Sequence, residues 1–255
     1  MPKSLFTELQ LKKLQKLGIL NELDLLLHLP SRYIDQTKLD LIKNIRPGNI
    51  CYIEAEVDTV EVSFRPRKNL VVNVKDKTAD LKIRFLNFYP SQVKQFEKGK
   101  ILRIFGEIKK NSFLFEMIHP QYEFIEPNTP LNNFYTPVYP LTEGLTQKLF
   151  SKLIQKVLIQ DNLDEKYPDY FKKLYKEKNF PTLINSLKLI HKPSNKYKKK
   201  LFDERETIFH QRVIYDELLA HQFFFRGNYH LNKSYKSKPI NYSKSTHENF
   251  LNNLE

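Results

Sequence analysis

The sequence predicts an α+β protein in which a five-stranded β-barrel is flanked by an N-terminal helical hairpin and a C-terminal helical segment. Three observations lead to this prediction. Short runs in the middle of the chain alternate apolar and polar residues, which is the period-two pattern of strands with one buried face. On both sides of these runs, leucines recur at roughly helical spacing. A chain of 255 residues is also long enough for one large domain or two modest ones with a real core.

The N-terminal segment, residues 1–46, is expected to be helical. Its leucines predict a first helix over residues 4–17, which Gly18 ends as a left-handed cap. A second short helix is expected from about Glu22 to His28, followed by a connector. Two helices joined at a glycine turn can bind a DNA backbone, although such hairpins more commonly just pack against their neighbours.

The barrel is predicted for residues 47–126. A short helix that ends at Gly99 is expected between its third and fourth strands, and Asn111-Ser112 is expected to form the last tight turn, since Asn tolerates positive φ. Five strands with a helix in this position match the OB-fold, a Greek-key barrel that binds oligonucleotides, while an SH3-like barrel is the alternative. The predicted strands cover residues 50–63, 69–74, 81–85, 101–108 and 113–118.

The loop after the third strand presents aromatic side chains in a strongly basic region. Phe88 and Tyr89 lie beside Pro90, and residues 62–110 carry 13 Lys and Arg against 4 Asp and Glu. Cations neutralise phosphates and rings stack on bases, so this surface suits nucleic acid. The competing interpretation is that the two rings fold back and cap the barrel. The side chains predicted to contact phosphates are Arg65, Arg67, Lys68, Arg84, Lys94, Lys98 and Lys100.

Residues 127–226 are predicted to be a Pro-rich connector followed by helices, and residues 227–255 a polar, poorly ordered tail. The connector is extended from Pro127 to Pro140. The last helix of the segment is expected to begin at Asp203 as N-cap, with Glu206 completing a capping box. The predicted helices cover residues 145–159, 168–176, 181–191 and 203–225, with a basic loop at 195–200.

Composition and missing motifs narrow the function classes. The net charge of +13 favours a polyanionic partner, although Lys- and Asn-rich usage also suits AT-biased coding. Cys51 is the only cysteine, which excludes an internal disulfide and a thiolate zinc site and suits a reducing cytoplasm. The sequence shows neither a secretory signal nor a membrane-spanning run. It also lacks a P-loop, G-x-G-x-x-G, H-E-x-x-H and G-x-S-x-G, so it indicates a binding module with no catalytic or metal site of its own.

Several phrases occur in an order that resembles the amino-terminal part of the RecG family, bacterial ATP-dependent DNA helicases that act on stalled forks and branched DNA. They are LGILNELDLLLHLPSRYID, VKDKTADLKIRFLNF, EKGKILRIFGEIKKN, FEMIHPQY, PVYPLTEGL, LIHKP and YDELLAHQ, within residues 14–225. The resemblance implies an OB-fold wedge, followed by two RecA-like motor domains that use ATP and Mg²⁺.

The resemblance also implies that aromatics after the third strand stack on unpaired bases at the branch point. The matching positions are Phe85 and Leu86, then Asn87 and Phe88. Many members carry an aromatic where this chain has Leu86, so Phe88 or Tyr89 is expected to substitute. The predicted stacking residues are therefore Phe85, Phe88 and Tyr89.

The resulting hypothesis is a cytoplasmic, monomeric wedge module that binds branched or forked DNA, including Holliday junctions, in replication-fork rescue, repair and recombination. By resemblance, a single-stranded-DNA-binding protein is a further partner. The motor motifs are missing from the sequence, so we expect a chain cut before the motor, without ATPase activity or cofactor of its own. Two alternatives stay open: an OB-fold RNA binder of the anticodon-reading kind, and a remnant of a truncated gene whose last helix exposes an apolar face.

Overall fold

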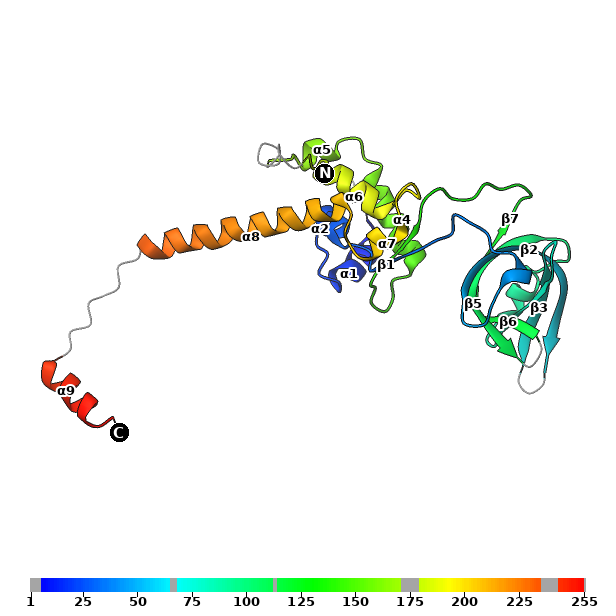
Figure 1. Ribbon diagram of the computed structural model, residues 1–255, viewed down its shortest axis with the longest axis horizontal. Helices are drawn as coiled ribbons and strands as arrows, with labels where there is room; N and C mark the ends of the chain where they lie inside the picture. Colours follow the sequence, from blue (N-terminus) through cyan, green and yellow to red (C-terminus); the bar gives the residue numbers. More distant parts are fainter. Residues whose placement is uncertain (1–5, 65–67, 112–113, 171–178, 235–242, 255) are drawn as a thin grey trace.

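A computed structural model describes residues 6–64, 68–111, 114–170, 179–234 and 243–254. These residues form a β-barrel and a separate helical unit, joined by two connecting segments, with a long helix that extends away from both (Figure 1). Nearly all of their buried apolar side chains fall into two clusters, one within each body. Among the described residues, no helix combines the length and apolar character needed to cross a membrane.

The barrel has the strand order β2-β3-β4-β6-β5-β7, and it closes because β2 also pairs with β5. The β4–β6 pair is parallel and the other pairs are antiparallel. This confirms the predicted α+β class and the OB-type barrel. Its elements are η1 (Ile42–Asn44), β2 (Ile50–Ser63), β3 (Asn69–Lys75), β4 (Asp80–Phe85), α3 (Pro90–Val93), β5 (Ile101–Asn111), β6 (Leu114–Ile118) and β7 (Gln121–Ile125).

Strand β2 closes the barrel because it bends between two partners. Its first half pairs with β5 from Ile50 to Glu56, and its second half pairs with β3 up to Ser63. The register shifts between Val57 and Thr59, an irregularity of the kind that bends a strand. The core is filled by the inward-facing residues of each strand, as the period-two pattern predicts.

A sixth strand, β7, follows the five strands that the sequence predicts. It pairs with β5 from Phe105↔Gln121 to Ile101↔Ile125 and places Tyr122 beside the barrel core. The predicted turn at Asn111-Ser112 lies partly outside the described residues.

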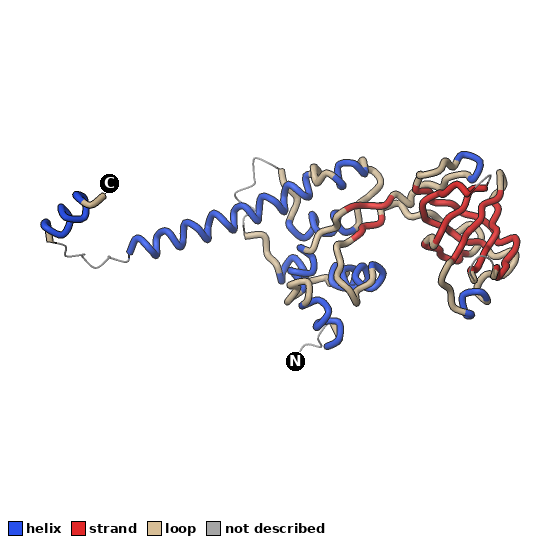
Figure 2. Tube along the Cα trace, turned by 90° about the horizontal axis from the view of Figure 1, so that it is seen from below, coloured by secondary structure: helices blue, strands red, loops and turns tan. Residues whose placement is uncertain are grey.

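The helical unit combines chain segments from both sides of the barrel. Its core includes Leu25, Phe150 and Ile190, which come from α2, α4 and α6. Figure 2 shows β1 and β8 as a separate ribbon, in which Arg32 pairs with Val138. The barrel is therefore inserted between two parts of one helical unit. The elements of this unit are α1 (Glu8–Gln15), α2 (Glu22–Leu27), β1 (Arg32–Ile34), β8 (Thr136–Val138), α4 (Gln147–Leu158), α5 (Leu163–Lys166), α6 (Leu183–His191) and α7 (Lys199–Asp203).

The C-terminal helices differ from the prediction. Asp203 does not cap the last helix but ends α7, and its carboxylate accepts a hydrogen bond from the Tyr33 amide at 2.9 Å. Arg205, with φ of 58°, then turns the chain, and Thr207 accepts from the His210 amide near the start of α8 (Ile208–Ser234). The helix predicted at 168–176 lies mostly outside the described residues.

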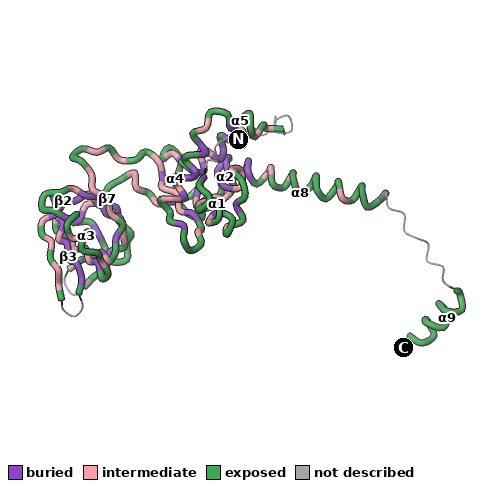
Figure 3. The backbone as a smooth tube through the Cα atoms, turned by 180° about the vertical axis from the view of Figure 1, so that it is seen from behind, coloured by how far each residue is buried: buried purple, intermediate pink, exposed green. Residues whose placement is uncertain are grey.

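Helix α8 continues past the predicted helix end at residue 225, so the tail is helical up to Ser234. A further helix, α9 (Lys244–Asn252), follows within residues expected to be poorly ordered. Figure 3 shows that most of α8 is exposed, and the exposed side chains include Leu218 and Phe224.

Candidate nucleic-acid interface

One end of the barrel brings the β2–β3 hairpin next to the loop between β4 and α3. We call residues 86–89 the tip loop. The Nζ atom of Lys68, the residue before β3, lies 5.7 Å from the centroid of the Phe88 ring. Lys68 and the four tip-loop residues line a surface pocket of about 430 Å³. A cation therefore sits over an aromatic face beside an accessible hollow, an arrangement that suits a nucleotide.

The tip loop is short because β4 ends at Phe85 and α3 already begins at Pro90. Pro90 occupies the first turn of α3, where its fixed φ and missing N–H cost nothing. Tyr89 has extended backbone angles, and its carbonyl accepts a hydrogen bond from the Gln92 amide at 2.9 Å. The Tyr89 side chain is 78% exposed and that of Leu86 is 49% exposed, while Phe88 is half-buried. Tyr89 thus does not fold back to cap the barrel, whereas the Phe88 ring packs partly against the barrel core.

Phe85 is placed differently from the predicted stacking residues of the tip loop. Only 4% of its surface is exposed, because it continues the inward-facing series of Leu81 and Ile83. Its ring packs edge-on against Tyr122, with 5.6 Å between ring centroids. A stacking role for Phe85 does not fit this position, and the exposed place beside it belongs to Leu86.

The predicted phosphate-binding side chains that the structure describes lie on several different elements of the barrel. Lys68 lies at the tip, Lys94 is exposed at the C-terminus of α3, and Lys98 is exposed in the loop after it. Lys100 lies directly before β5 and pairs with Glu97 at 3.0 Å. Arg65 and Arg67 lie outside the described residues.

Arg84 is the predicted cation that fits a phosphate contact least well. Its guanidinium pairs with Glu116 at 2.9 Å, and its side chain is only 22% exposed. The pair joins β4 to β6, its parallel neighbour, so the charge of Arg84 is already balanced within the barrel. Sequence reasoning missed this because Glu116 lies on a different strand.

Support beneath the tip loop comes from residues that the sequence prediction missed. The rings of Tyr122 and Phe96 lie 4.9 Å apart, and both contact Phe85. The Tyr122 hydroxyl also lies within hydrogen-bond distance of the Gln95 side chain, at 3.3 Å. The alternating run QYEFI in β7 was the available signal for Tyr122.

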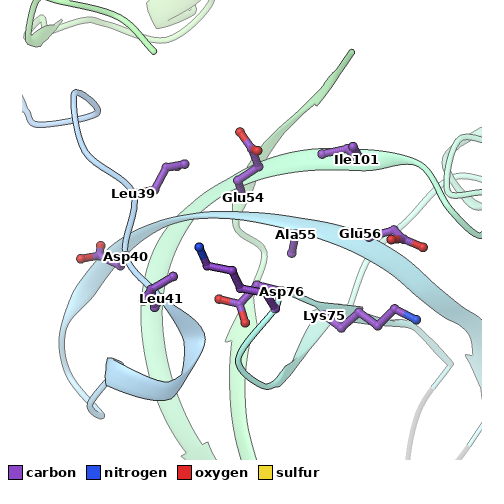
Figure 4. Close-up of a pocket in the computed structure, with 10 residues that line it drawn as sticks. Leu39, Asp40, Leu41, Glu54, Ala55, Glu56, Lys75, Asp76 and Ile101 are labelled. Atoms are coloured by element: carbon purple, nitrogen blue, oxygen red, sulfur yellow. The ribbon is translucent and has the colours of Figure 1, made fainter. Parts of the chain in front are cut away.

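A larger cavity, of about 510 Å³, lies beside the middle of β2 (Figure 4). Carboxylates dominate its charged lining, so it is unsuited to phosphates. The Asp76 carboxylate already accepts hydrogen bonds from Thr78, Ile42 and Ala79. Burial acts to raise the pKa of Asp76, but these hydrogen bonds outweigh it, so the pKa is lowered. The lining residues are Leu39, Asp40, Leu41, Glu54, Ala55, Glu56, Lys75, Asp76, Lys77 and Ile101.

Comparison with protein families matches residues 6–160 of the chain to the RecG wedge domain. The chain belongs to the RecG wedge domain family. It is 33% identical over 247 residues to the ATP-dependent DNA helicase RecG of Haemophilus influenzae, covering 95% of this chain and 35% of that protein. With RecG of Escherichia coli K12 it shares 33% identity over 211 residues, covering 82% of this chain and 30% of the relative. The chain thus spans about a third of the length of these relatives.

A solved structure of RecG bound to a three-way DNA junction has the same fold. It superimposes with a TM-score of 0.67 at 22% identity and covers 98% of this chain and 34% of that one. The fold of this chain, with its closed barrel, therefore matches that of the corresponding third of the solved structure.

Proposed function

We propose that this chain is the DNA-binding wedge of a RecG-type helicase and that its tip loop recognises the branch point of forked DNA. The observation that carries the proposal is the barrel end itself. There, an exposed tyrosine, an exposed leucine and a half-buried phenylalanine project from one short loop, with Lys68 over the phenylalanine ring. The related RecG structure bound to a three-way junction supports the choice of a branched ligand.

In this mechanism, the aromatic side chains contact bases and the lysines contact phosphates. Where two strands part, the last bases lose a stacking partner, and Tyr89 and Phe88 supply ring faces to replace it. Lys68 and Lys94 hold the flanking phosphates, which positions the junction without reading sequence. A binder of this kind prefers a branch to a matched duplex, because a continuous duplex offers no unpaired bases on which the rings can stack.

The curated relatives are ATP-dependent DNA helicases about three times as long as the matched region. We propose that the wedge splits strands while the remaining length of such a protein supplies ATP-driven movement. Its role in the cell would then be the rescue of stalled forks, with repair and recombination as consequences.

The decisive experiment measures affinity for a three-way junction, a matched duplex and a single strand by fluorescence anisotropy across a salt series. Replacing both Phe88 and Tyr89 by Ala should weaken junction binding by roughly 5- to 150-fold per lost stack and leave duplex affinity nearly unchanged. Tyr170→Ala is the matched control, because Tyr170 is 83% exposed but lies in the helical unit. Equal junction affinity in the double variant would refute the assignment of the tip loop.

The phosphate contacts are tested separately. Lys68→Ala should weaken binding to all DNAs alike and reduce the magnitude of the salt slope by about one. A tRNA competitor that displaces the junction at equal concentration would favour the RNA-binding alternative.

A further inference from the structure

His119 holds the beginning of the tip loop from outside the loop. It lies in the turn between β6 and β7, with φ of 50°, a left-handed conformation that non-glycine residues rarely adopt. Its backbone N–H donates to the Arg84 carbonyl at 2.9 Å. Its ring Nε2 accepts a hydrogen bond from the Leu86 backbone N–H at 3.1 Å. The two bonds bracket Phe85, the last residue of β4.

These bonds come where ordinary strand pairing stops. The last paired residues of β4 and β6 are Arg84 and Ile118. Beyond them, no backbone carbonyl of β6 pairs with the Leu86 amide, and the imidazole nitrogen takes that place. The ladder is in effect extended by one hydrogen bond through a side chain. The direction in which the chain leaves the barrel at Leu86 thus depends on His119.

The turn that carries His119 is itself held against the barrel. The His119 ring meets Phe85 edge-on, with 5.9 Å between ring centroids. Pro120 packs directly over Gly106 of β5, where an added Cβ atom would lie only 3.2 Å from the Pro120 Cβ atom. A side chain at Gly106 would push the turn outward, and the left-handed backbone at His119 leaves it little room to adjust.

We propose that His119 is a positioning residue that fixes the tip loop in its junction-binding conformation. The inference rests on the proposed function, because it names a residue that acts through Leu86, Phe88 and Tyr89 without touching DNA itself. A loop that leaves the barrel in one direction presents its rings already placed, so the junction does not have to order it on binding. Without the His119 acceptor, the Leu86 amide loses its partner and the loop samples other directions.

The hydrogen bond is tested by NMR before any DNA is added. A ring whose Nε2 accepts must carry its proton on Nδ1, so imidazole ¹⁵N shifts should report the Nδ1–H tautomer for His119. In His119→Ala, the Leu86 amide resonance should shift and its hydrogen exchange should accelerate. In His119→Gln, whose side-chain oxygen can accept in place of Nε2, protection of the Leu86 amide should return. His230→Ala, an exposed histidine of α8, is the matched control.

The positioning role is tested by the ratio of junction affinity to duplex affinity. His119→Ala should lower this ratio by about 2- to 12-fold, the scale of one neutral hydrogen bond, and His119→Gln should restore it. An unchanged Leu86 amide in His119→Ala would overturn the proposed hydrogen bond. A changed amide with an unchanged ratio would overturn the positioning role.

Failure of the proposed function would look different. If the Phe88 and Tyr89 double variant kept full junction affinity, the tip loop would not recognise the junction, and the proposed role of His119 in recognition would be overturned with it. The Leu86 amide would still show whether His119 orders the loop. If His119→Ala does not fold, His119→Gln and the imidazole shifts of the unmodified chain decide the hydrogen bond.

Discussion

His191 should make the stability of the helical unit depend on pH. The ring is completely buried at the end of α6. Its Nε2 atom lies 2.7 Å from the Leu26 carbonyl, to which it donates, and its Nδ1 atom accepts from the Tyr139 hydroxyl at 3.0 Å. Burial is the main cause that lowers the pKa of His191 from 6.5 to about 4, although the Leu26 hydrogen bond acts in the opposite direction.

The sign of the effect follows from which state binds the proton. As the pH falls through 6.5, the unfolded chain protonates this histidine, while the folded chain keeps it neutral until about pH 4. Stability is therefore fully present above pH 6.5 and is lost between pH 6.5 and pH 4. One unit of pKa is worth about 1.4 kcal/mol, so the total is about 3 kcal/mol, of which about 2 kcal/mol is lost by pH 5. Burial also lowers the pKa of His210, so that residue acts in the same direction.

The assay is urea unfolding at pH 7 and at pH 5, followed by circular dichroism. His191→Gln should be less stable than the unmodified chain at pH 7, because it cannot reproduce both hydrogen bonds of the ring. Its loss of stability between pH 7 and pH 5 should nevertheless be smaller by about 2 kcal/mol. His230→Gln, an exposed site on α8, should keep the full loss. The protonation of carboxylates changes the stability of all three chains equally between pH 7 and pH 5. If His191→Gln lost as much stability over this range as the unmodified chain, the reasoning would be refuted.

Three further substitutions test the packing described above. Gly106→Ala places a methyl group 3.2 Å from Pro120, so it should destabilise the barrel by about 1–3 kcal/mol in urea unfolding. Arg103→Met removes the hydrogen bond to the Thr129 carbonyl, and limited proteolysis should then cut the following connector faster than in the unmodified chain. Ile53→Ala, at a fully buried barrel position, should cost about 2–5 kcal/mol in the barrel's unfolding transition alone, since the helical unit has its own core.

The barrel could be predicted from the sequence because each of its main strands alternates over several residues, and the loop aromatics and lysines follow in order along the chain. The β1–β8 ribbon could not be predicted, since three-residue strands carry too little pattern and their partners lie about 100 residues apart. The capping-box pattern at Asp203 was a local signal that tertiary structure overrode, because the Tyr33 amide takes its carboxylate.

The candidate site, too, could be predicted from the sequence only in part. Composition predicted a basic, aromatic barrel end, but it could not reveal which charges are already balanced. Arg84 is neutralised by Glu116, which is distant in sequence and adjacent only through the parallel strand pair. For Phe85, the chain's own alternation with Leu81 and Ile83 already indicated an inward ring, and this local pattern was a better guide than the resemblance.

The insertion of the barrel into the helical unit bears on how a wedge could work. An element that parts two strands must not swivel when the DNA pushes back, and a barrel on a single flexible tether would do so. Here the chain enters and leaves the barrel through two segments, and the buried Arg103 donates to the carbonyls of Thr129 and Pro130 at the exit. The same guanidinium pairs with Glu54 at 2.9 Å, which ties the exit segment to β2.

Arg103 donates to carbonyls in the segment that follows one end of β7, while the tip contacts of His119 precede the other end of that strand. Recognition and anchoring are thus carried by different residues. Arg103→Met should therefore leave the Leu86 amide and the affinity of the isolated chain for a junction unchanged. Its effect should be confined to how firmly the barrel is held to the helical unit, which proteolysis of the connector measures directly. A loss of junction affinity in this variant would show that the two ends are coupled through the barrel.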